Sequence, residues 1–210
     1  MNILKLFRRH TTKQPESPAT LESYEIVLSG SGGQGIILGG RILAEAASIY
    51  DNKEAIMTQS YGPEARGGAS RAEVIINSSK IYYPKVVHVD VLLAMTQEAL
   101  NAYGNTLDEN GLLIVDEILV KDVPHSFKNV FKAPFSTLAV KLLDAPIVVN
   151  IIALGSLAAI TKAVSREALI HATLDHVPQR LLVLNRIAVD IGFKAVNDSG
   201  FKWNKERKLK

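Results

Sequence analysis

Short apolar segments alternate with amphipathic segments along most of the chain. Strand-like segments span residues 24–29, 55–58, 72–76, 81–83, 89–95, 112–115 and, more weakly, 130–133 and 147–149. Residues 91–95 and 112–115 are apolar without interruption, which is typical of strands buried on both faces. Helical patterns span residues 36–50, 97–103, 136–143, 151–161, 165–174 and 181–196. Strands that alternate with helices predict an α/β fold.

Turn residues and helix caps add detail to this fold. The polar turn at residues 77–80 is so short that the strands on either side must form an antiparallel hairpin, which makes the sheet mixed. Asn150 and Ser165 are suited to cap the helices that follow them. We therefore predict a Rossmann-like, three-layer α/β/α sandwich with a mixed, mostly parallel sheet.

Length and composition fit one globular domain. The chain has 210 residues, of which 47% are hydrophobic and 21% charged. A chain of this size can bury a core without disulfides or metals. We predict a flexible basic tail over residues 1–22, the domain over residues 23–197 and a basic tail over residues 198–210. Trp203 in the second tail docks either on this domain or on a partner.

Positive charge is concentrated at the two ends of the chain. The net charge is +3, with +3 on residues 1–20 and +4 on residues 202–210, so the remainder carries −4. An acidic body does not support nucleic-acid binding. No stretch approaches the roughly 20 apolar residues of a membrane span, although residues 3–9 could form an amphipathic helix on a membrane surface.

The chain contains no cysteine. This excludes disulfides, thiolate zinc sites, cysteine-ligated iron–sulfur clusters and cysteine nucleophiles on this chain. The five histidines share no metal-ligand spacing, so we expect surface or packing roles for them. Asp116 and Glu117 lie at the end of a buried strand, where they face a site, cap a helix or form a solvated turn. We predict no metal ligand and no catalytic residue on this chain.

A glycine-rich loop follows the first predicted strand and precedes a helix. Its candidate binding residues are Gly30, Gly32, Gly33, Gln34 and Gly35. Glycines allow positive φ angles, and the free N–H groups at a helix start attract phosphate. Ile36 excludes a Walker A motif, and no acidic residue ends the second strand to hold a ribose, which weakens a dinucleotide interpretation. A purely structural turn stays the alternative.

A second polar loop follows the second predicted strand, and its candidate binding residues are Ser60, Tyr61, Arg66 and Arg71. The two guanidinium groups suit phosphate or carboxylate. In a doubly wound sheet this loop would stand beside the glycine loop, because both loops follow adjacent strands. The alternative is an internal ion pair of Glu64 with one of the arginines, which would stiffen the loop.

The two loops together resemble the γ subunits of 2-oxoacid:ferredoxin oxidoreductases, over roughly residues 24–193. The resemblance rests on residues 30–35 and 58–70, with matching residues in order at 83–85, 90–92, 97–99, 150 and 154–155. Gln59, Ala65, Ala69 and Ser70 are most similar to the 2-oxoglutarate enzymes. The resemblance implies the fold of catalytic domain III of pyruvate:ferredoxin oxidoreductase.

The resemblance also implies a function. Such complexes decarboxylate a 2-oxoacid oxidatively with coenzyme A, giving acyl-CoA, CO2 and reduced ferredoxin. They use thiamine diphosphate, magnesium and iron–sulfur clusters, which partner α, β and ferredoxin-like δ subunits would hold. Alone, this chain would bind no cofactor and would be inactive. In the complex, its two loops would bind coenzyme A. The complex would be cytoplasmic. A free-standing nucleotide- or NAD-binding module is the competing hypothesis.

Overall fold

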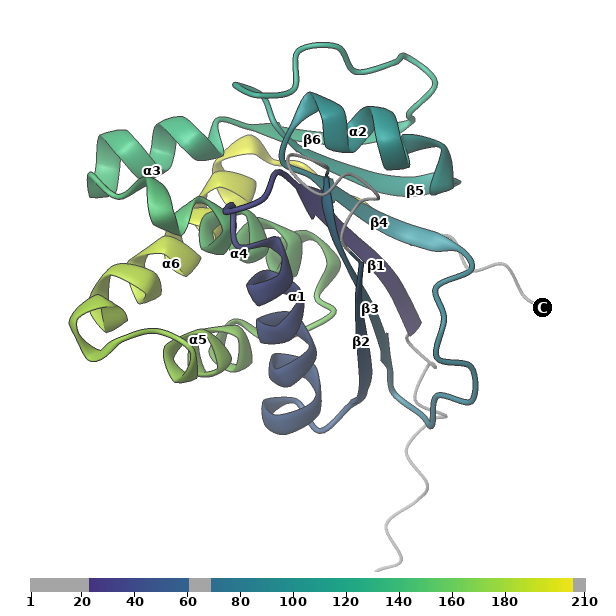
Figure 1. Cartoon of the computed structure of the whole chain (residues 1–210), viewed down its shortest axis with the longest axis horizontal. Helices are drawn as coiled ribbons and strands as arrows, with labels where there is room; N and C mark the ends of the chain where they lie inside the picture. Colours follow the sequence, from purple (N-terminus) through teal and green to yellow (C-terminus); the bar gives the residue numbers. More distant parts are fainter. Residues whose placement is uncertain (1–22, 61–68, 206–210) are drawn as a thin grey trace, which may run out of the picture.

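A six-stranded sheet forms the centre of the computed structural model, which describes residues 23–60 and 69–205 (Figure 1). Its strands are β1 (Ser23–Gly30), β2 (Glu54–Ser60), β3 (Ser70–Asn77), β4 (Val89–Ala94), β5 (Leu107–Asp116) and β6 (Asn129–Ala133). Their order across the sheet is β2-β3-β1-β4-β5-β6. Strands β1, β4, β5 and β6 are parallel, whereas β3 runs antiparallel to both β1 and β2. The prediction of a mixed, mostly parallel sheet is therefore confirmed.

The predicted hairpin between residues 72–76 and 81–83 is wrong. Strand β3 pairs with β1 along one side and with β2 along the other, so both of its hydrogen-bonding edges are occupied. A strand has only two such edges, and no place is left for a third neighbour. Residues 81–83 accordingly form no strand.

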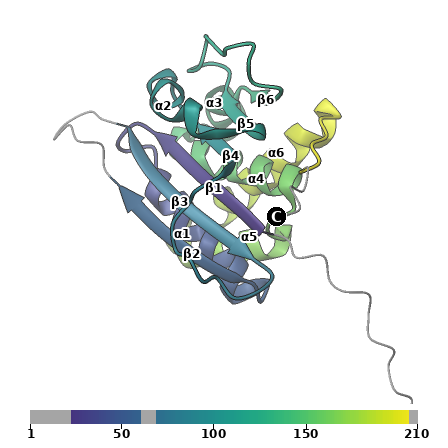
Figure 2. The ribbon, with the colours of Figure 1, turned by 90° about the vertical axis from the view of Figure 1, so that its right-hand side faces the viewer.

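Helices cover the two faces of the sheet unequally. One face carries α1 (Ile36–Glu45), α3 (Phe135–Leu143), α4 (Val149–Thr161), α5 (Arg166–Asp175) and α6 (Leu182–Ser199). The other face carries α2 (Gln97–Tyr103) over β1 and β4. Successive residues of β1 divide between two cores, because strand side chains alternate: Ile26 and Leu28 join the larger core and Val27 joins the smaller one. Figure 2 looks onto this second face, with β1, β3 and β2 in front and α2 at the top.

Helix α4 lies at the centre of the helical layer, and nearly all of its side chains are buried. It crosses α6 closely, because a β-carbon at Gly155 would lie 2.5 Å from the Val189 carbonyl oxygen, and one at Gly192 would lie 2.2 Å from that of Ile152. The extended conformation predicted for residues 147–149 is wrong, since a short 3-10 helix (Pro146–Val148) leads into α4. Asn150 is consequently the second residue of α4 rather than its cap, whereas Ser165 caps α5 as predicted.

The residues after α6 pack against the amino ends of the strands. Phe201 contacts the ring of Phe131, and Trp203 is 8% exposed and donates to the Asn110 carbonyl at 3.2 Å. Lys205 pairs with Asp90, with 2.6 Å between Nζ and Oδ2. Of the two alternatives for Trp203, the structure shows docking on this domain. We call residues 200–205 the C-terminal strap; the domain boundaries themselves stay predictions, and residues 1–22 lie outside the described part.

Candidate functional site

The glycine loop connects β1 to α1 and depends on glycine at two positions. Gly33 and Gly35 have φ angles of 87° and 70°, which residues with side chains rarely adopt. At Gly35 a β-carbon would also lie 2.4 Å from Asn150 Nδ2. Gly32 differs, because no atom of residues 23–60 and 69–205 lies within 4 Å of the place where its β-carbon would stand. The loop is therefore tightly packed at Gly35 and open at Gly32.

Gln34 shapes the loop from inside. Its Oε1 atom accepts a hydrogen bond from the Ser31 backbone N–H at 2.8 Å, and the Gln34 N–H donates to the Ser31 carbonyl at 3.2 Å. A β-carbon at Gly30 would lie 2.4 Å from the same Oε1 atom, so Gly30 leaves the space that this side chain occupies. Two of the predicted binding residues thus build the turn.

The open side of the loop presents backbone donors. Within residues 23–60 and 69–205, the N–H groups of Gly32, Gly33 and Gly35 have no hydrogen-bond acceptor. Helix α1 has no side-chain cap and no acidic residue in its first turn. Unpaired N–H groups and the helix dipole together favour an anion at such a position.

A second helix begins at the same place. The Asn150 side chain, at the start of α4, donates from Nδ2 to the Gly35 carbonyl at 3.2 Å. The first turn of α4, like that of α1, has no acidic residue. Because the positive ends of both helix dipoles lie at the glycine loop, beside the carboxyl end of β1, the electrostatic preference for an anion is reinforced. The sequence suggests Asn150 as a helix cap and as part of the family resemblance, but it does not indicate its partner 115 positions away.

The second predicted loop reaches this edge by a route that differs from the one expected. Strands β1 and β2 are not neighbours, because β3 lies between them. In the register of β3, Ser70 stands opposite Gly30, and Arg71 stands between Ser29 and Ser60. The start of β3 therefore lies directly beside the end of β1. Ser60 is the exposed last residue of β2, while Tyr61 and Arg66 lie outside the described residues.

Arg71 is held by its own surroundings. Its guanidinium forms an ion pair with Glu73 and lies over the Tyr103 ring of α2, 5.0 Å from the centroid. The side chain is only 20% exposed. The expected partner Glu64 lies outside the described residues, but Glu73 is two residues along the same strand and therefore on the same face, which the alternation of a strand could have indicated. Arg71 thus supports the sheet on the face opposite α1.

The remaining polar candidates have structural partners. Asp116 is fully buried, and its carboxylate accepts from the backbone N–H groups of Ser136 at 2.8 Å and Ile118 at 2.9 Å, so it supports the first turn of α3 and is not part of a solvated turn. His171 stacks on Tyr50, and His176 lies 2.5 Å from Glu45. In the described part of the chain, no group of three or more acidic or histidine side chains could hold a metal ion.

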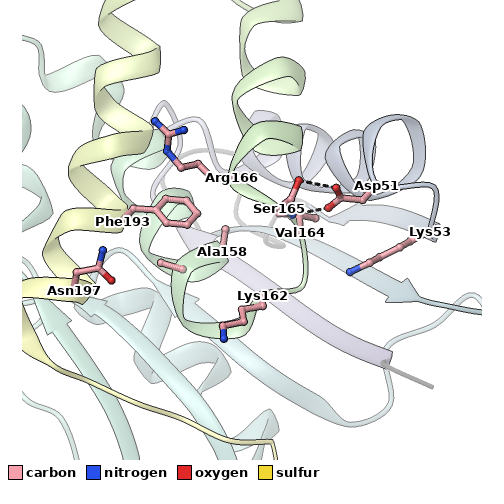
Figure 3. A pocket seen from close by; sticks show the side chains of 10 residues that line it. Asp51, Lys53, Ala158, Lys162, Val164, Ser165, Arg166, Phe193 and Asn197 are labelled. Atoms are coloured by element: carbon pink, nitrogen blue, oxygen red, sulfur yellow. Dashed lines mark hydrogen bonds between the residues drawn. The ribbon is translucent and has the colours of Figure 1, made fainter. Parts of the chain in front are cut away.

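A hollow of about 540 Å³ lies at the far end of α4, between α5, α6 and the start of β2 (Figure 3). Two of the cations that line it are engaged: Lys53 Nζ donates to the Ala163 carbonyl at 2.8 Å, and Arg166 Nε donates to Asp190 at 2.9 Å. Asp51 accepts from the Ser165 hydroxyl at 2.6 Å. These contacts join α5 to its neighbours, so the hollow lies at a junction between elements.

The structure is an α/β domain with a glycine loop between its first strand and first helix, and the comparisons with known proteins identify its family. The chain belongs to the pyruvate ferredoxin/flavodoxin oxidoreductase family, which matches residues 25–195. It is 46% identical to 2-oxoglutarate synthase subunit KorC of Methanocaldococcus jannaschii, covering 83% of this chain and 94% of the relative. It is 30% identical to pyruvate synthase subunit PorC of the same organism, over 80% of this chain and 94% of that protein.

Solved structures agree with these relatives. The γ subunit of a keto/oxoacid ferredoxin oxidoreductase from Geobacter sulfurreducens superposes with a TM-score of 0.76 at 46% identity, covering 83% of this chain and 99% of that one. Pyruvate oxidoreductase subunit PORC from Thermotoga maritima gives a TM-score of 0.67 at 26% identity, over 82% and 96% of the two chains. The predicted resemblance to oxidoreductase γ subunits is confirmed, and a free-standing NAD-binding module is not favoured. No helix in the described residues has both the length and the apolar character that a membrane crossing needs.

Proposed function

We propose that this chain is the γ subunit of a 2-oxoglutarate:ferredoxin oxidoreductase, and that it contributes to assembly and to coenzyme A binding. The observation that carries the proposal is its 46% identity with KorC over 94% of that subunit. The complex would convert 2-oxoglutarate and coenzyme A into succinyl-CoA and CO2, and would pass the two electrons to ferredoxin.

The resident cofactors belong on partner chains in this proposal. A chain without cysteine cannot ligate iron–sulfur clusters through thiolates. Thiamine diphosphate and magnesium would be held by the α and β subunits, and the clusters by a ferredoxin-like δ subunit and the other cysteine-containing chains. The assembled enzyme would work in the cytoplasm.

Coenzyme A is the phosphorylated substrate of the proposed reaction, and the glycine loop is the place on this chain suited to its phosphates. The open N–H groups of Gly32, Gly33 and Gly35 lie next to the starts of α1 and α4. Arg66 and Tyr61 belong to the segment that leads into β3, whose first residue pairs with Gly30. Among the other predicted residues, Gly30, Gln34, Ser60 and Arg71 would shape this edge rather than bind the phosphates.

Assembly is tested by removing this chain from the native host and purifying the rest of the complex. We expect 2-oxoglutarate- and coenzyme A-dependent dye reduction to fall to background, while iron and acid-labile sulfide stay on the remaining chains. Re-addition of the purified chain should restore activity. Full activity of the remaining chains without this one would overturn the proposed subunit role.

The coenzyme A role is tested with Arg66→Ala in the assembled complex. Loss of one charge-assisted hydrogen bond costs about 1.5–3 kcal/mol, so the apparent KM for coenzyme A should rise about 10- to 150-fold while that for 2-oxoglutarate stays constant. Arg41→Ala is the matched control, because Arg41 is an exposed arginine that pairs within α1. Unchanged coenzyme A dependence in an assembled Arg66→Ala complex would place Arg66 in a structural role.

A further inference from the structure

Asn150 joins the two helix starts through both ends of its side-chain amide. Nδ2 donates to the Gly35 carbonyl at 3.2 Å, and Oδ1 accepts from the Ile151 backbone N–H at 2.9 Å. The residue is 6% exposed. Since one partner is an acceptor and the other a donor, the orientation of the amide is determined, and only an asparagine satisfies both at this distance from the backbone.

The bond to Gly35 acts on the loop through the geometry of a peptide unit. The Gly35 carbonyl also accepts from the Gly39 N–H at 2.8 Å, so it points along α1. Its carbonyl oxygen and the N–H of Ile36 belong to one planar, trans peptide and point in opposite directions. Holding the oxygen therefore aims the Ile36 N–H toward the open side of the glycine loop.

The conformation that this bond holds needs support. Gly35 occupies the left-handed region at φ 70°, and glycine has more alternative conformations than any other residue. Helix α1 has no side-chain cap of its own that could restrict the loop. Asn150, in contrast, stands on a rigid support, because α4 is buried and locked to α6 at Gly155 and Gly192.

We infer that Asn150 is a positioning residue, which pins Gly35 from α4 and keeps the glycine loop in the conformation that binds the phosphates of coenzyme A. This inference rests on the proposed function above for the identity of the anion. Asn150 itself need not touch the ligand. It replaces the missing cap of α1 with a hydrogen bond from a neighbouring helix.

The test compares Asn150→Ser with Asn185→Ser in the assembled complex. Serine at position 150 is too short to reach Gly35. Asn185 is the matched control, because it is 3% exposed, lies near the start of α6, and donates from Nδ2 to the Leu181 carbonyl at 2.9 Å. Two quantities are measured: amide hydrogen exchange of residues 31–39, and the apparent KM values and kcat with coenzyme A and 2-oxoglutarate.

We expect Asn150→Ser to speed exchange in residues 31–39 and to raise the apparent KM for coenzyme A about 10-fold, the equivalent of one net hydrogen bond. The KM for 2-oxoglutarate and kcat should stay near wild type, and Asn185→Ser should change neither the exchange nor the KM values. If Asn150→Ser does not assemble, Asn150→Asp keeps the size of the side chain while removing the donor to Gly35, and the same readouts apply.

Unchanged exchange in residues 31–39 would overturn the inference, because Asn150 would then not hold the loop. Faster exchange with an unchanged KM for coenzyme A would overturn its role in binding. The Arg66→Ala result separates the two cases that remain. A raised KM for coenzyme A in Arg66→Ala would leave the proposed function intact while this inference fails. An unchanged KM for coenzyme A in both Arg66→Ala and Asn150→Ser would mean that coenzyme A does not bind at the glycine loop.

Discussion

The carboxyl and amino ends of the strands differ in how their polar groups are satisfied. At the carboxyl end of β1, the glycine loop has backbone N–H groups that find no acceptor among the described residues, and α1 begins without a side-chain cap. At the amino ends, the C-terminal strap buries Trp203 and places Lys205 against Asp90. The carboxyl ends leave polar groups available to a ligand, and at the amino ends the polar groups bond to one another.

This difference separates binding from stability. Unpaired donors and an uncapped helix each forgo about 1 kcal/mol of stabilisation, which is tolerated where a ligand can supply the missing partner. The strap lies beyond residues 25–195, the part matched by the family, whereas the glycine loop lies within it. We therefore expect changes at the carboxyl edge to affect coenzyme A use, and changes at the strap to affect unfolding alone.

The largest effect is expected from Gly35→Ala. A β-carbon there meets Asn150 Nδ2 at 2.4 Å, and the φ angle of 70° disfavours alanine, so the substitution should cost about 2–5 kcal/mol and disrupt coenzyme A use. Gly32→Ala is the control for stability, since no atom of the described residues lies within 4 Å of its β-carbon position. Urea unfolding compares the two variants, and coenzyme A kinetics compare Gly35→Ala with the wild-type complex. Equal losses of stability in the two variants would show that the loop is not pinned at Gly35.

Trp203→Ala should cost about 3 kcal/mol in the free energy of unfolding, because it removes a buried aromatic side chain and its hydrogen bond to Asn110. The KM for coenzyme A should stay unchanged in the assembled complex. Tyr82→Ala truncates an aromatic side chain that is 86% exposed and should change stability by less than about 0.5 kcal/mol. A change in KM with Trp203→Ala would mean that the two edges are coupled.

Lys205→Met should cost about 1 kcal/mol. It removes an ammonium group that pairs with Asp90 and lies 5.0 Å from the centroid of the Tyr24 ring, but the side chain is 27% exposed and solvent screens part of the attraction. Lys202, an exposed lysine of the same strap, provides the control, and Lys202→Met should leave the urea midpoint unchanged. Equal stability of the Lys205 and Lys202 variants would show that the ion pair with Asp90 does not contribute to the free energy of unfolding.

The smallest effect concerns pH. Burial raises the pKa of Asp90 above its ordinary value, although hydrogen bonds from Lys205 and the Glu25 N–H act in the opposite direction. A raised pKa means that the folded state binds the proton more tightly than the unfolded chain does. The contribution of Asp90 to stability is therefore fully present below the unfolded pKa of about 3.9 and is lost as pH rises through the folded pKa.

This sign can be measured against Asp90→Asn by urea unfolding at a series of pH values from about 3.5 upward. The stability of the wild-type protein relative to the variant should decrease as pH rises through this range. A relative stability that instead grows with pH would show that the pairing with Lys205 outweighs burial.

The sequence by itself determined most elements and the family. The apolar residues 91–94 of β4, the short helix α2 and the serine that caps α5 depend on residues close together in the chain, so local patterns predict them. The Gly-rich and Arg-containing loops carry enough specific residues to indicate the oxidoreductase γ subunits from the sequence alone.

Only the tertiary structure decided which strands pair and which side chains meet across the chain. Alternation of apolar residues in β3 shows that it is a strand but not that β1 and β2 occupy both of its edges, because hydrogen bonding between strands is independent of sequence distance. The same holds for Asn150 with Gly35, Arg71 with Tyr103, and Lys205 with Asp90. Each of these contacts exists because the packing of distant elements brings a donor to an acceptor, or a cation to an aromatic ring. Local sequence patterns do not predict such packing.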